Sequence, residues 1–131
     1  MDVQVLNGLL TRPGPSARSY RVGCFTVVEF RGEVDLASAQ QIQAHTDAAT
    51  AQRGARLIVD LAPATFIDCS ALRLLCRARR RALDGGGSID LVCTHPLHLE
   101  ILRRAGLDGY FPAHSSVSAI SAGRPDDDRP S

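Results

Sequence analysis

The chain has 131 residues, of which 44% are hydrophobic, and a formal net charge of +1 at pH 7. This length suits one compact domain and excludes two of ordinary size, and the near-neutral charge excludes a surface built for general nucleic-acid binding. The four cysteines form no C-x-x-C pair and have no histidine at zinc-finger spacing, so we expect no structural metal site.

The two ends of the chain differ in composition from its middle. Residues 1–16 contain Pro13-Gly14-Pro15 and lack periodicity, and residues 123–131 are mainly arginine, proline and aspartate. We therefore expect a domain over residues 17–122, between a loosely ordered N-terminal segment and a disordered tail. The apolar run Val3–Leu10 lacks a basic leader, and no run reaches the roughly 18 apolar residues of a membrane span. These features predict a cytoplasmic protein without membrane insertion.

The first half of the domain predicts a hairpin followed by a helix. Arg18–Val22 and Phe25–Arg31 are short runs with strand-forming residues on either side of a glycine. Ala37–Gln52 carries Ala, Gln and Ile at helical spacing, with Asp35 or Ser38 as the candidate N-cap.

The second half alternates predicted strands with predicted helices. In chain order, these elements are the strand Leu57–Leu61, the helix Ser70–Leu83, the strand Ile89–Cys93, a helix opening at Thr94-His95-Pro96 and ending at Gly106, a short strand near Tyr110–Phe111, and a small helix over Ser115–Ala122. This order predicts an α/β fold with a mixed, mainly parallel sheet of four to five strands, covered by about four helices.

Ser70 is the residue on which the functional interpretation depends. It falls at the start of a predicted helix, as the N-cap or in the first turn, where free backbone N–H groups and the helix dipole favour an anion. A phosphoserine there would add about −1.5 to −2 charges, which makes the position suitable for a reversible switch. The alternative is an ordinary capping serine.

Three further polar residues each follow a predicted strand, namely Asp35, Asp68 and Thr94. The carboxyl ends of parallel strands meet at one edge of the sheet, where ligands and partners dock. We therefore expect these residues to share that edge with Ser70. Helix capping is the alternative role for the two aspartates.

Two motifs resemble those of the STAS domain, the fold of bacterial anti-sigma factor antagonists. They are Gly32-Glu33-Val34-Asp35-Leu36 and Phe66-Ile67-Asp68-Cys69-Ser70-Ala71-Leu72, and the strand Leu57–Leu61 and the element order agree with the same fold. The resemblance implies that Ser70 is the serine that a partner kinase phosphorylates. It also implies partner-contacting roles for Asp35 and Asp68.

The second motif departs from the family pattern at two positions. The family glycine is Ala71 here, and Cys69 stands where Ser or Thr is common. Because both flank Ser70, we expect Cys69 and Ala71 to belong to the partner-binding surface, together with Thr94. The added methyl group of Ala71 is expected to slow phosphorylation.

The resemblance implies partner switching rather than catalysis by this chain. The unphosphorylated protein would bind an anti-sigma factor that is a serine kinase, phosphorylation at Ser70 would release it, and a PP2C-type phosphatase would reset the cycle. No cofactor is implied, and the chain has no nucleotide-binding loop of the G-x-x-x-x-G-K-[ST] type. The alternative is a constitutive STAS accessory subunit of a lipid-transport ATP-driven complex.

Two side hypotheses concern cysteines and arginines. A thiol near a helix N-terminus is easily oxidised, so Cys69 is a candidate redox residue, paired with Cys76 or Cys93. The helix after Ser70 is rich in arginine, so Arg73 and Arg77 are candidates to face an acidic partner, with solubility as the alternative.

Overall fold

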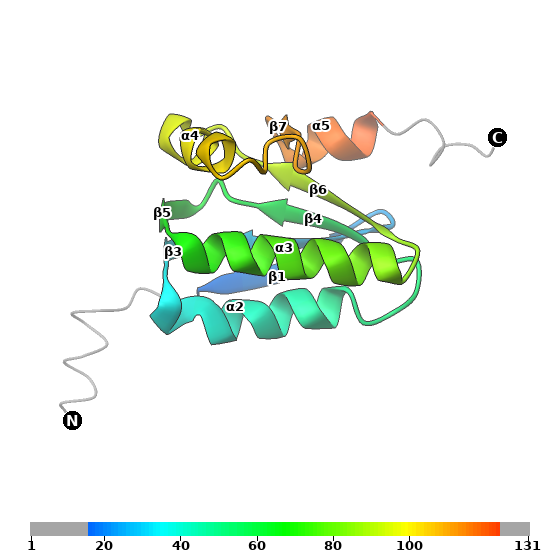
Figure 1. The fold of residues 1–131 in the computed structure, drawn as a ribbon. Helices are drawn as coiled ribbons and strands as arrows, with labels where there is room; N and C mark the ends of the chain where they lie inside the picture. Colours follow the sequence, from blue (N-terminus) through cyan, green and yellow to red (C-terminus); the bar gives the residue numbers. More distant parts are fainter. Residues whose placement is uncertain (1–15, 124–131) are drawn as a thin grey trace, which may run out of the picture.

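Three apolar strands form the centre of the fold in the computed structural model, which describes residues 16–123 (Figure 1). They are β2 (Phe25–Phe30), β4 (Arg56–Asp60) and β6 (Ser88–Val92), and they lie parallel in that spatial order. Leu57 packs into the core on one face of the sheet and Ile58 into the core on the other. Burial on both faces explains the continuous apolar run Leu57–Val59 in β4.

Two edge strands complete this sheet, whose order is β1-β2-β4-β6-β7. β1 (Ala17–Val22) pairs antiparallel with β2 and confirms the predicted hairpin, and β7 (Ala113–His114) pairs parallel with β6. The last short strand predicted near Tyr110–Phe111 is present as β7, but it begins two residues after Phe111. Tyr110 instead lies in a turn, where its N–H donates to the Leu107 carbonyl, and Phe111 is buried in the core.

A second sheet of two parallel strands stands apart from the first and has no counterpart in the sequence prediction. β3 (Gly32–Val34) pairs with β5 (Ala64–Ile67). The chain leaves the first sheet at Gly32, whose φ of 66° lies in the left-handed region that favours glycine. The strands are only three and four residues long, and the side chain of Phe66 faces solvent, so neither shows a clear alternating pattern.

Helices cover both faces of the five-stranded sheet. α2 (Leu36–Ala49) and α3 (Cys69–Asp84) pack side by side on one face, and α5 (Val117–Ala122) packs on the other through Ile120. α4 (Pro96–Arg104) follows β6. Within residues 16–123, four helices and a mainly parallel sheet confirm the predicted α/β class.

Asp47 of α2 ties this helix to α3. Its carboxylate accepts two hydrogen bonds of 2.9 Å from the Arg77 guanidinium and lies 3.4 Å from the Arg81 guanidinium. The hydrogen bond from Arg77 lowers the pKa of Asp47. The hypothesis that Arg77 faces a partner is therefore wrong, because its guanidinium is held against α2.

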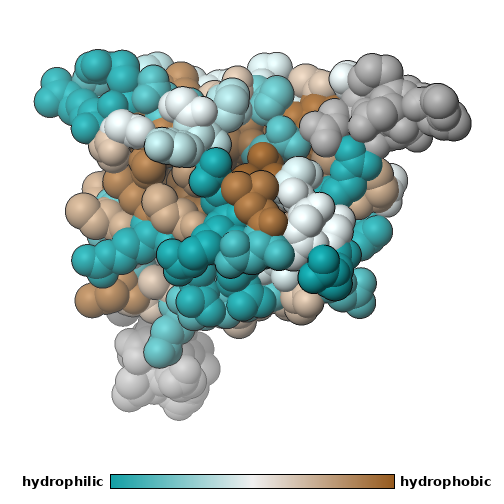
Figure 2. Space-filling view, turned by 45° about the vertical axis from the view of Figure 1, so that its right-hand side comes forward, coloured by the Kyte–Doolittle hydropathy of each residue, from teal (hydrophilic) through white to brown (hydrophobic). Residues whose placement is uncertain are grey.

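The surface around the C-terminal ends of α2 and α3 is mainly hydrophilic. Figure 2 shows teal side chains over much of this face and apolar side chains broken into patches. Arg80 is among the exposed residues of α3. This hydrophilic surface is consistent with the alternative that the arginines on the outer face of α3 keep the protein soluble.

The expected flexible ends fall outside the part of the chain that the structure describes, apart from Ser16 and Gly123. Between these two residues, no helix combines the length and the apolar character that crossing a bilayer requires.

Replacing Gly87 by alanine is expected to lower the free energy of unfolding by about 1–3 kcal/mol, because the new methyl group overpacks a tight contact. A Cβ at Gly87 would lie 1.9 Å from the Ala55 carbonyl oxygen. Urea unfolding measures the difference. Gly109→Ala is the control, since a Cβ there meets no atom within 4 Å. Equal stability of the two variants would contradict the described contact.

Asp47→Asn is expected to cost about 1 kcal/mol of stability at pH 7, because it weakens the bonds to Arg77 and Arg81. The pKa of Asp47 is lowered in the folded state, so its contribution is present above the ordinary value of 3.8 and is lost as the pH falls through the lowered pKa. When unfolding is measured as a function of pH, the unfolding free energies of the variant and the wild type should therefore converge in acid. Asp84→Asn, at an exposed position at the end of α3, should show no such convergence.

Candidate functional site

Two strand-to-helix turns lie side by side at one end of the molecule. β3 leads through Asp35 into α2, and β5 leads through Asp68 into α3. Val34 and Ile67 are register partners, and the Asp68 N–H donates to the Val34 carbonyl at 3.3 Å. Adjacent strands are about 4.8 Å apart, so the two aspartates are neighbours. Figure 1 shows α2 and α3 starting at the same end.

Each aspartate is the N-cap of the helix that follows it. The Asp35 carboxylate accepts from the Ser38 N–H at 3.1 Å, and the Ser38 hydroxyl accepts from the Asp35 N–H at 3.1 Å, which completes a capping box. The Asp68 carboxylate accepts from the Ser70 N–H at 2.7 Å. Of the two cap candidates for α2, the structure therefore selects Asp35.

Ser70 is the second residue of α3 and is partly exposed. Asp68 performs the capping, so the Ser70 side chain is not needed for it. Within residues 16–123 the Ser70 hydroxyl makes no hydrogen bond, whereas its backbone N–H is held by Asp68. The hydroxyl is therefore free to react or to contact another molecule, while its backbone is fixed.

The electrostatics of this end favour negative charge. The N-termini of α2 and α3 both carry positive partial charge, and the two capping carboxylates satisfy part of it. A phosphate at a helix N-terminus is stabilised by the same backbone N–H groups. Among the described residues, no three His, Cys, Asp or Glu side chains lie close enough together to hold a metal ion.

The two residues that flank Ser70 differ in exposure. Cys69, the first residue of α3, is exposed, whereas Ala71 is fully buried in the core. The expectation that Ala71 contacts a partner is therefore wrong. Its methyl group points into the core and adds no bulk where a kinase would approach Ser70, so the expected slowing of phosphorylation loses its physical basis.

Thr94 is exposed and follows β6, which belongs to the five-stranded sheet. It precedes the N-cap of α4, His95, whose ring accepts from the Leu97 N–H, and Pro96 occupies the first turn as predicted. In the described part of the chain, no hydrogen bond joins Thr94 to the two capping aspartates or to Ser70. The structure thus unites Asp35, Asp68 and Ser70 directly, and Thr94 belongs to a separate strand-to-helix turn.

Two exposed apolar residues beside the caps escaped the sequence analysis. Leu36 directly follows Asp35 and is 76% exposed, and Phe66 of β5 is 50% exposed. Solvent-facing apolar side chains beside polar groups are typical of interaction surfaces. The sequence signal for Leu36 was available: it is an apolar residue immediately after a helix cap. Phe66 was hidden because β5 itself was not predicted.

The cysteines do not form the predicted redox pairs. Cys69 and Cys76 are seven residues apart on α3, about 10 Å along its axis, and a disulfide needs Cα atoms within about 7 Å. Cys93 is buried, and burial raises the pKa of its thiol, which disfavours the reactive thiolate. The pairing of Cys69 with Cys76 within one chain is therefore wrong, and Cys93 is a poor partner.

A protein-family model, the STAS domain, matches residues 17–120. Among solved structures, an anti-sigma factor antagonist from Mycobacterium paratuberculosis is 23% identical, with a TM-score of 0.76, and the match covers 88% of this chain and 100% of that one. The anti-sigma factor antagonist SpoIIAA in its unphosphorylated form is 23% identical, with a TM-score of 0.69, and the match covers 82% and 96% of the two chains.

The Bacillus cell fate determinant SpoIIAA in the phosphorylated form is 22% identical, with a TM-score of 0.64, and the match covers 82% of this chain and 99% of that one. No curated protein matches the chain in sequence. At these identities the structural likeness shows a shared fold.

Replacing Asp68 by alanine is expected to cost about 1 kcal/mol of unfolding free energy, because it removes the N-cap of α3. Ser70→Ala is expected to change stability by less than about 0.5 kcal/mol, since the hydroxyl has no partner to lose. Denaturant unfolding compares the two, with Asp35→Ala as a second cap variant. A cost for Ser70→Ala equal to that for Asp68→Ala would show that the serine side chain does the capping.

Proposed function

The chain belongs to the STAS domain family, and from this premise we propose that it is an anti-sigma factor antagonist that works by partner switching. In its unphosphorylated form it binds an anti-sigma factor that is also a serine kinase, and this displaces the sigma factor. Phosphorylation of Ser70 by that kinase releases the protein, and a PP2C-type phosphatase restores it. The chain itself binds and does not catalyse, and it needs no cofactor.

The observation that carries this proposal is the division of roles between Asp68 and Ser70. The Asp68 carboxylate holds the backbone N–H of Ser70 at 2.7 Å, and the partly exposed Ser70 hydroxyl has no hydrogen-bond partner in the described part of the chain. A kinase therefore meets a hydroxyl whose backbone is fixed and which is not engaged in holding the helix. The fold similarity to SpoIIAA, which is solved in unphosphorylated and phosphorylated forms, supports the same interpretation.

Phosphorylation at this position is compatible with the fold. A phosphoryl group in the first turn of α3 lies near the positive end of the helix dipole, so it does not oppose the helix. Its effect is exerted on the partner. An interface that fits a neutral hydroxyl beside Asp68 has to accommodate about two more negative charges next to that carboxylate once Ser70 is phosphorylated. Charge repulsion and the desolvation of these charges then both oppose binding.

We place the partner-binding surface around the two turns. Asp35, Asp68 and Cys69 supply its polar part, and Leu36 and Phe66 supply apolar contacts around them. Thr94 extends the surface toward α4. The sigma factor and its regulators act on transcription, so the proposal implies action in the cytoplasm without nucleic-acid contact by this chain.

The substitutions Ser70→Ala and Ser70→Asp test the switch with opposite expectations. Ser70→Ala should bind the anti-sigma kinase at least as tightly as the wild type and should persist in the complex. Ser70→Asp should bind at least about tenfold more weakly, which corresponds to about 1.4 kcal/mol. Ser118→Asp, at an exposed position in α5, is the control for added charge alone. Equal affinities of the two Ser70 variants for the kinase would refute the mechanism.

The kinase for that test comes from the protein's own cells. The protein is isolated with its partners, the partners are identified, and Ser70 is examined by peptide mass spectrometry in the same sample. We expect a phosphoryl group on Ser70 and a serine-kinase anti-sigma factor among the partners. An unmodified Ser70 together with a transport ATPase would favour the accessory-subunit function instead.

A further inference from the structure

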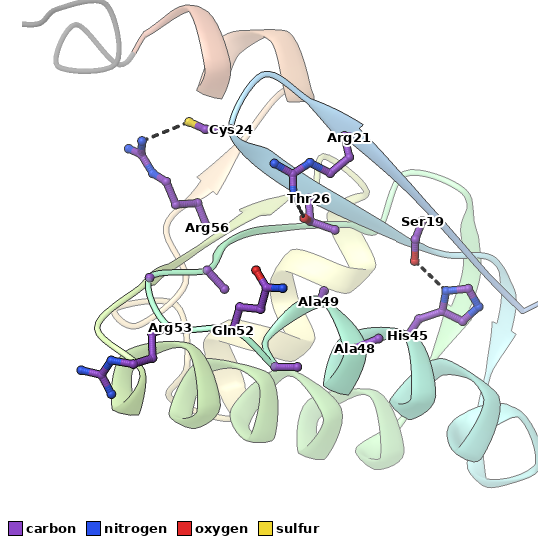
Figure 3. A pocket seen from close by; sticks show the side chains of 13 residues that line it. Ser19, Arg21, Cys24, Thr26, His45, Ala48, Ala49, Gln52, Arg53 and Arg56 are labelled. Carbon is purple, nitrogen blue, oxygen red and sulfur yellow. Dashed lines mark hydrogen bonds between the residues drawn. The ribbon is translucent and has the colours of Figure 1, made fainter.

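A pocket of about 430 Å³ lies at the opposite end of the molecule from Ser70. It is bounded by the β1–β2 hairpin on one side and by the last turn of α2 and the loop after it on the other (Figure 3). α2 begins at the end of the molecule that carries Ser70 and is 14 residues long. The pocket at its other end is therefore about 20 Å from the Ser70 end, measured along this helix. The volume is in the range of small-molecule sites.

The lining of this pocket is basic. It includes Arg21 from β1, Arg53 from the loop and Arg56 from β4, and none of the lining residues between Ser16 and Gly123 is an aspartate or a glutamate. Within the described residues, the Arg53 guanidinium makes no hydrogen bond or ion pair, and the hydrogen bond of Arg21 goes to the neutral hydroxyl of Thr26. Most of the other arginines that make a contact are paired with carboxylates; Arg77, for example, is paired with Asp47. Arg21 and Arg53 therefore bring positive charge to the pocket that no carboxylate among the described lining residues neutralises.

The walls of the pocket are fixed by hydrogen bonds. The Gly54 N–H donates to the Gly85 carbonyl at 2.8 Å, and the Ser88 N–H donates to the Ala55 carbonyl at 2.9 Å, so the loop that carries Arg53 is held against the start of β6. The Arg21–Thr26 bond of 3.1 Å spans the hairpin at a cross-strand pair. A preformed wall loses less conformational entropy when a ligand binds.

The other end of the pocket is closed between β1 and α2. Ser19 Oγ and His45 Nδ1 are hydrogen-bonded at 2.6 Å across this gap. Figure 3 shows Arg21 and Gln52 extending between the hairpin and the helix, with the Ser19–His45 pair at one side and Arg53 and Arg56 at the other. Hydroxyl, amide and guanidinium groups thus border one continuous space.

One feature opposes an anion here, namely the C-terminal end of α2, which carries partial negative charge. The Thr46 and Asp47 carbonyls in its last turn are already occupied. The Thr50 N–H and hydroxyl both donate to the Thr46 carbonyl, and the Arg81 guanidinium donates to the Asp47 carbonyl at 3.1 Å. The capped helix end leaves the arginines as the dominant charges of the pocket.

We propose that this pocket is a second binding site of the protein, for a small polyanion bearing phosphate or carboxylate groups. Guanidinium groups bind both by paired charge-assisted hydrogen bonds. Arg21, whose guanidinium lies over the space between the hairpin and the helix, is the principal ligand, and Arg53 at the rim adds positive charge (Figure 3). Thr26 and Gln52 supply neutral polar contacts. The inference stands on the pocket alone and does not depend on the switch at Ser70.

Inorganic pyrophosphate and citrate are the probes, titrated into the full chain at constant ionic strength with sodium chloride as the reference salt. Calorimetry or backbone NMR shifts should show saturable binding of at least one of the two, with the shifts centred on residues 19–26 and 52–56. The double variant Arg21→Gln/Arg53→Gln should bind at least about tenfold more weakly, because the charge-assisted contact of Arg21 and the positive charge of Arg53 at the rim are both lost.

The matched control is Arg80→Gln/Arg104→Gln, which removes the same net charge from exposed positions outside the pocket. It should change the affinity for the anion by less than about twofold, because charges outside the pocket act on the anion only through a field that the salt screens. Preference for pyrophosphate or for citrate identifies the phosphate or the carboxylate class. Absence of binding beyond sodium chloride, or equal losses in the two double variants, would overturn the proposal.

Cys24 provides an independent reporter inside the pocket. Its thiol is exposed and accepts a hydrogen bond from the Arg56 guanidinium at 3.1 Å. Anionic iodoacetate and neutral iodoacetamide both alkylate a thiolate, forming a thioether and releasing iodide. Peptide mass spectrometry separates Cys24 from the exposed Cys69 and Cys76, which serve as internal references.

The ratio of iodoacetate to iodoacetamide rates should be higher at Cys24 than at either reference thiol. Saturation with the bound anion should slow alkylation at Cys24 and leave Cys69 and Cys76 unchanged. Equal slowing at all three thiols, or no slowing at Cys24 while the anion is bound, would place the anion elsewhere and refute the assignment.

Discussion

The parallel pairing of β3 with β5 is the constraint on which the functional end of the molecule depends. Because Val34 and Ile67 are register partners, the next residues, Asp35 and Asp68, become neighbours, and the helices they cap start side by side. Neither strand is long enough to be stable by itself, so the pair is held by its connection to the larger sheet and by the helices that follow. Two helix N-termini are thereby presented together, at a surface with two exposed apolar side chains.

Capping by Asp68 also explains why Ser70 is suited to modification. A serine that capped α3 through its hydroxyl would lose that bond on phosphorylation, and the helix would have to find another cap. Here the carboxylate two residues earlier holds the backbone N–H of Ser70, and the hydroxyl is independent of the fold. A change of charge at Ser70 can therefore alter an interface and leave the helix intact, which is what a reversible switch requires.

The two ends of α2 carry opposite kinds of surface. Its N-terminus lies among capping carboxylates and exposed leucine and phenylalanine side chains. Its C-terminus borders a pocket whose described lining residues include three arginines and no carboxylate. Asp47, between the two ends, fixes α2 to α3 through Arg77 and Arg81. These contacts attach α2 to α3 between the two surfaces.

Local pattern was sufficient for much of this protein. Apolar runs predicted β2, β4 and β6, helical spacing predicted α2 and α3, and the position of Ser70 after a strand indicated a helix start. The tertiary structure decided what local pattern could not, because strand pairing and burial depend on distant residues. It revealed β3 and β5, turned Ala71 into the core and Leu36 out to solvent, assigned capping to Asp68, and separated Cys69 from Cys76 along one helix. It also brought Arg21, Arg53 and Arg56 to one pocket from β1, a loop and β4, a proximity that spacing in the sequence does not encode.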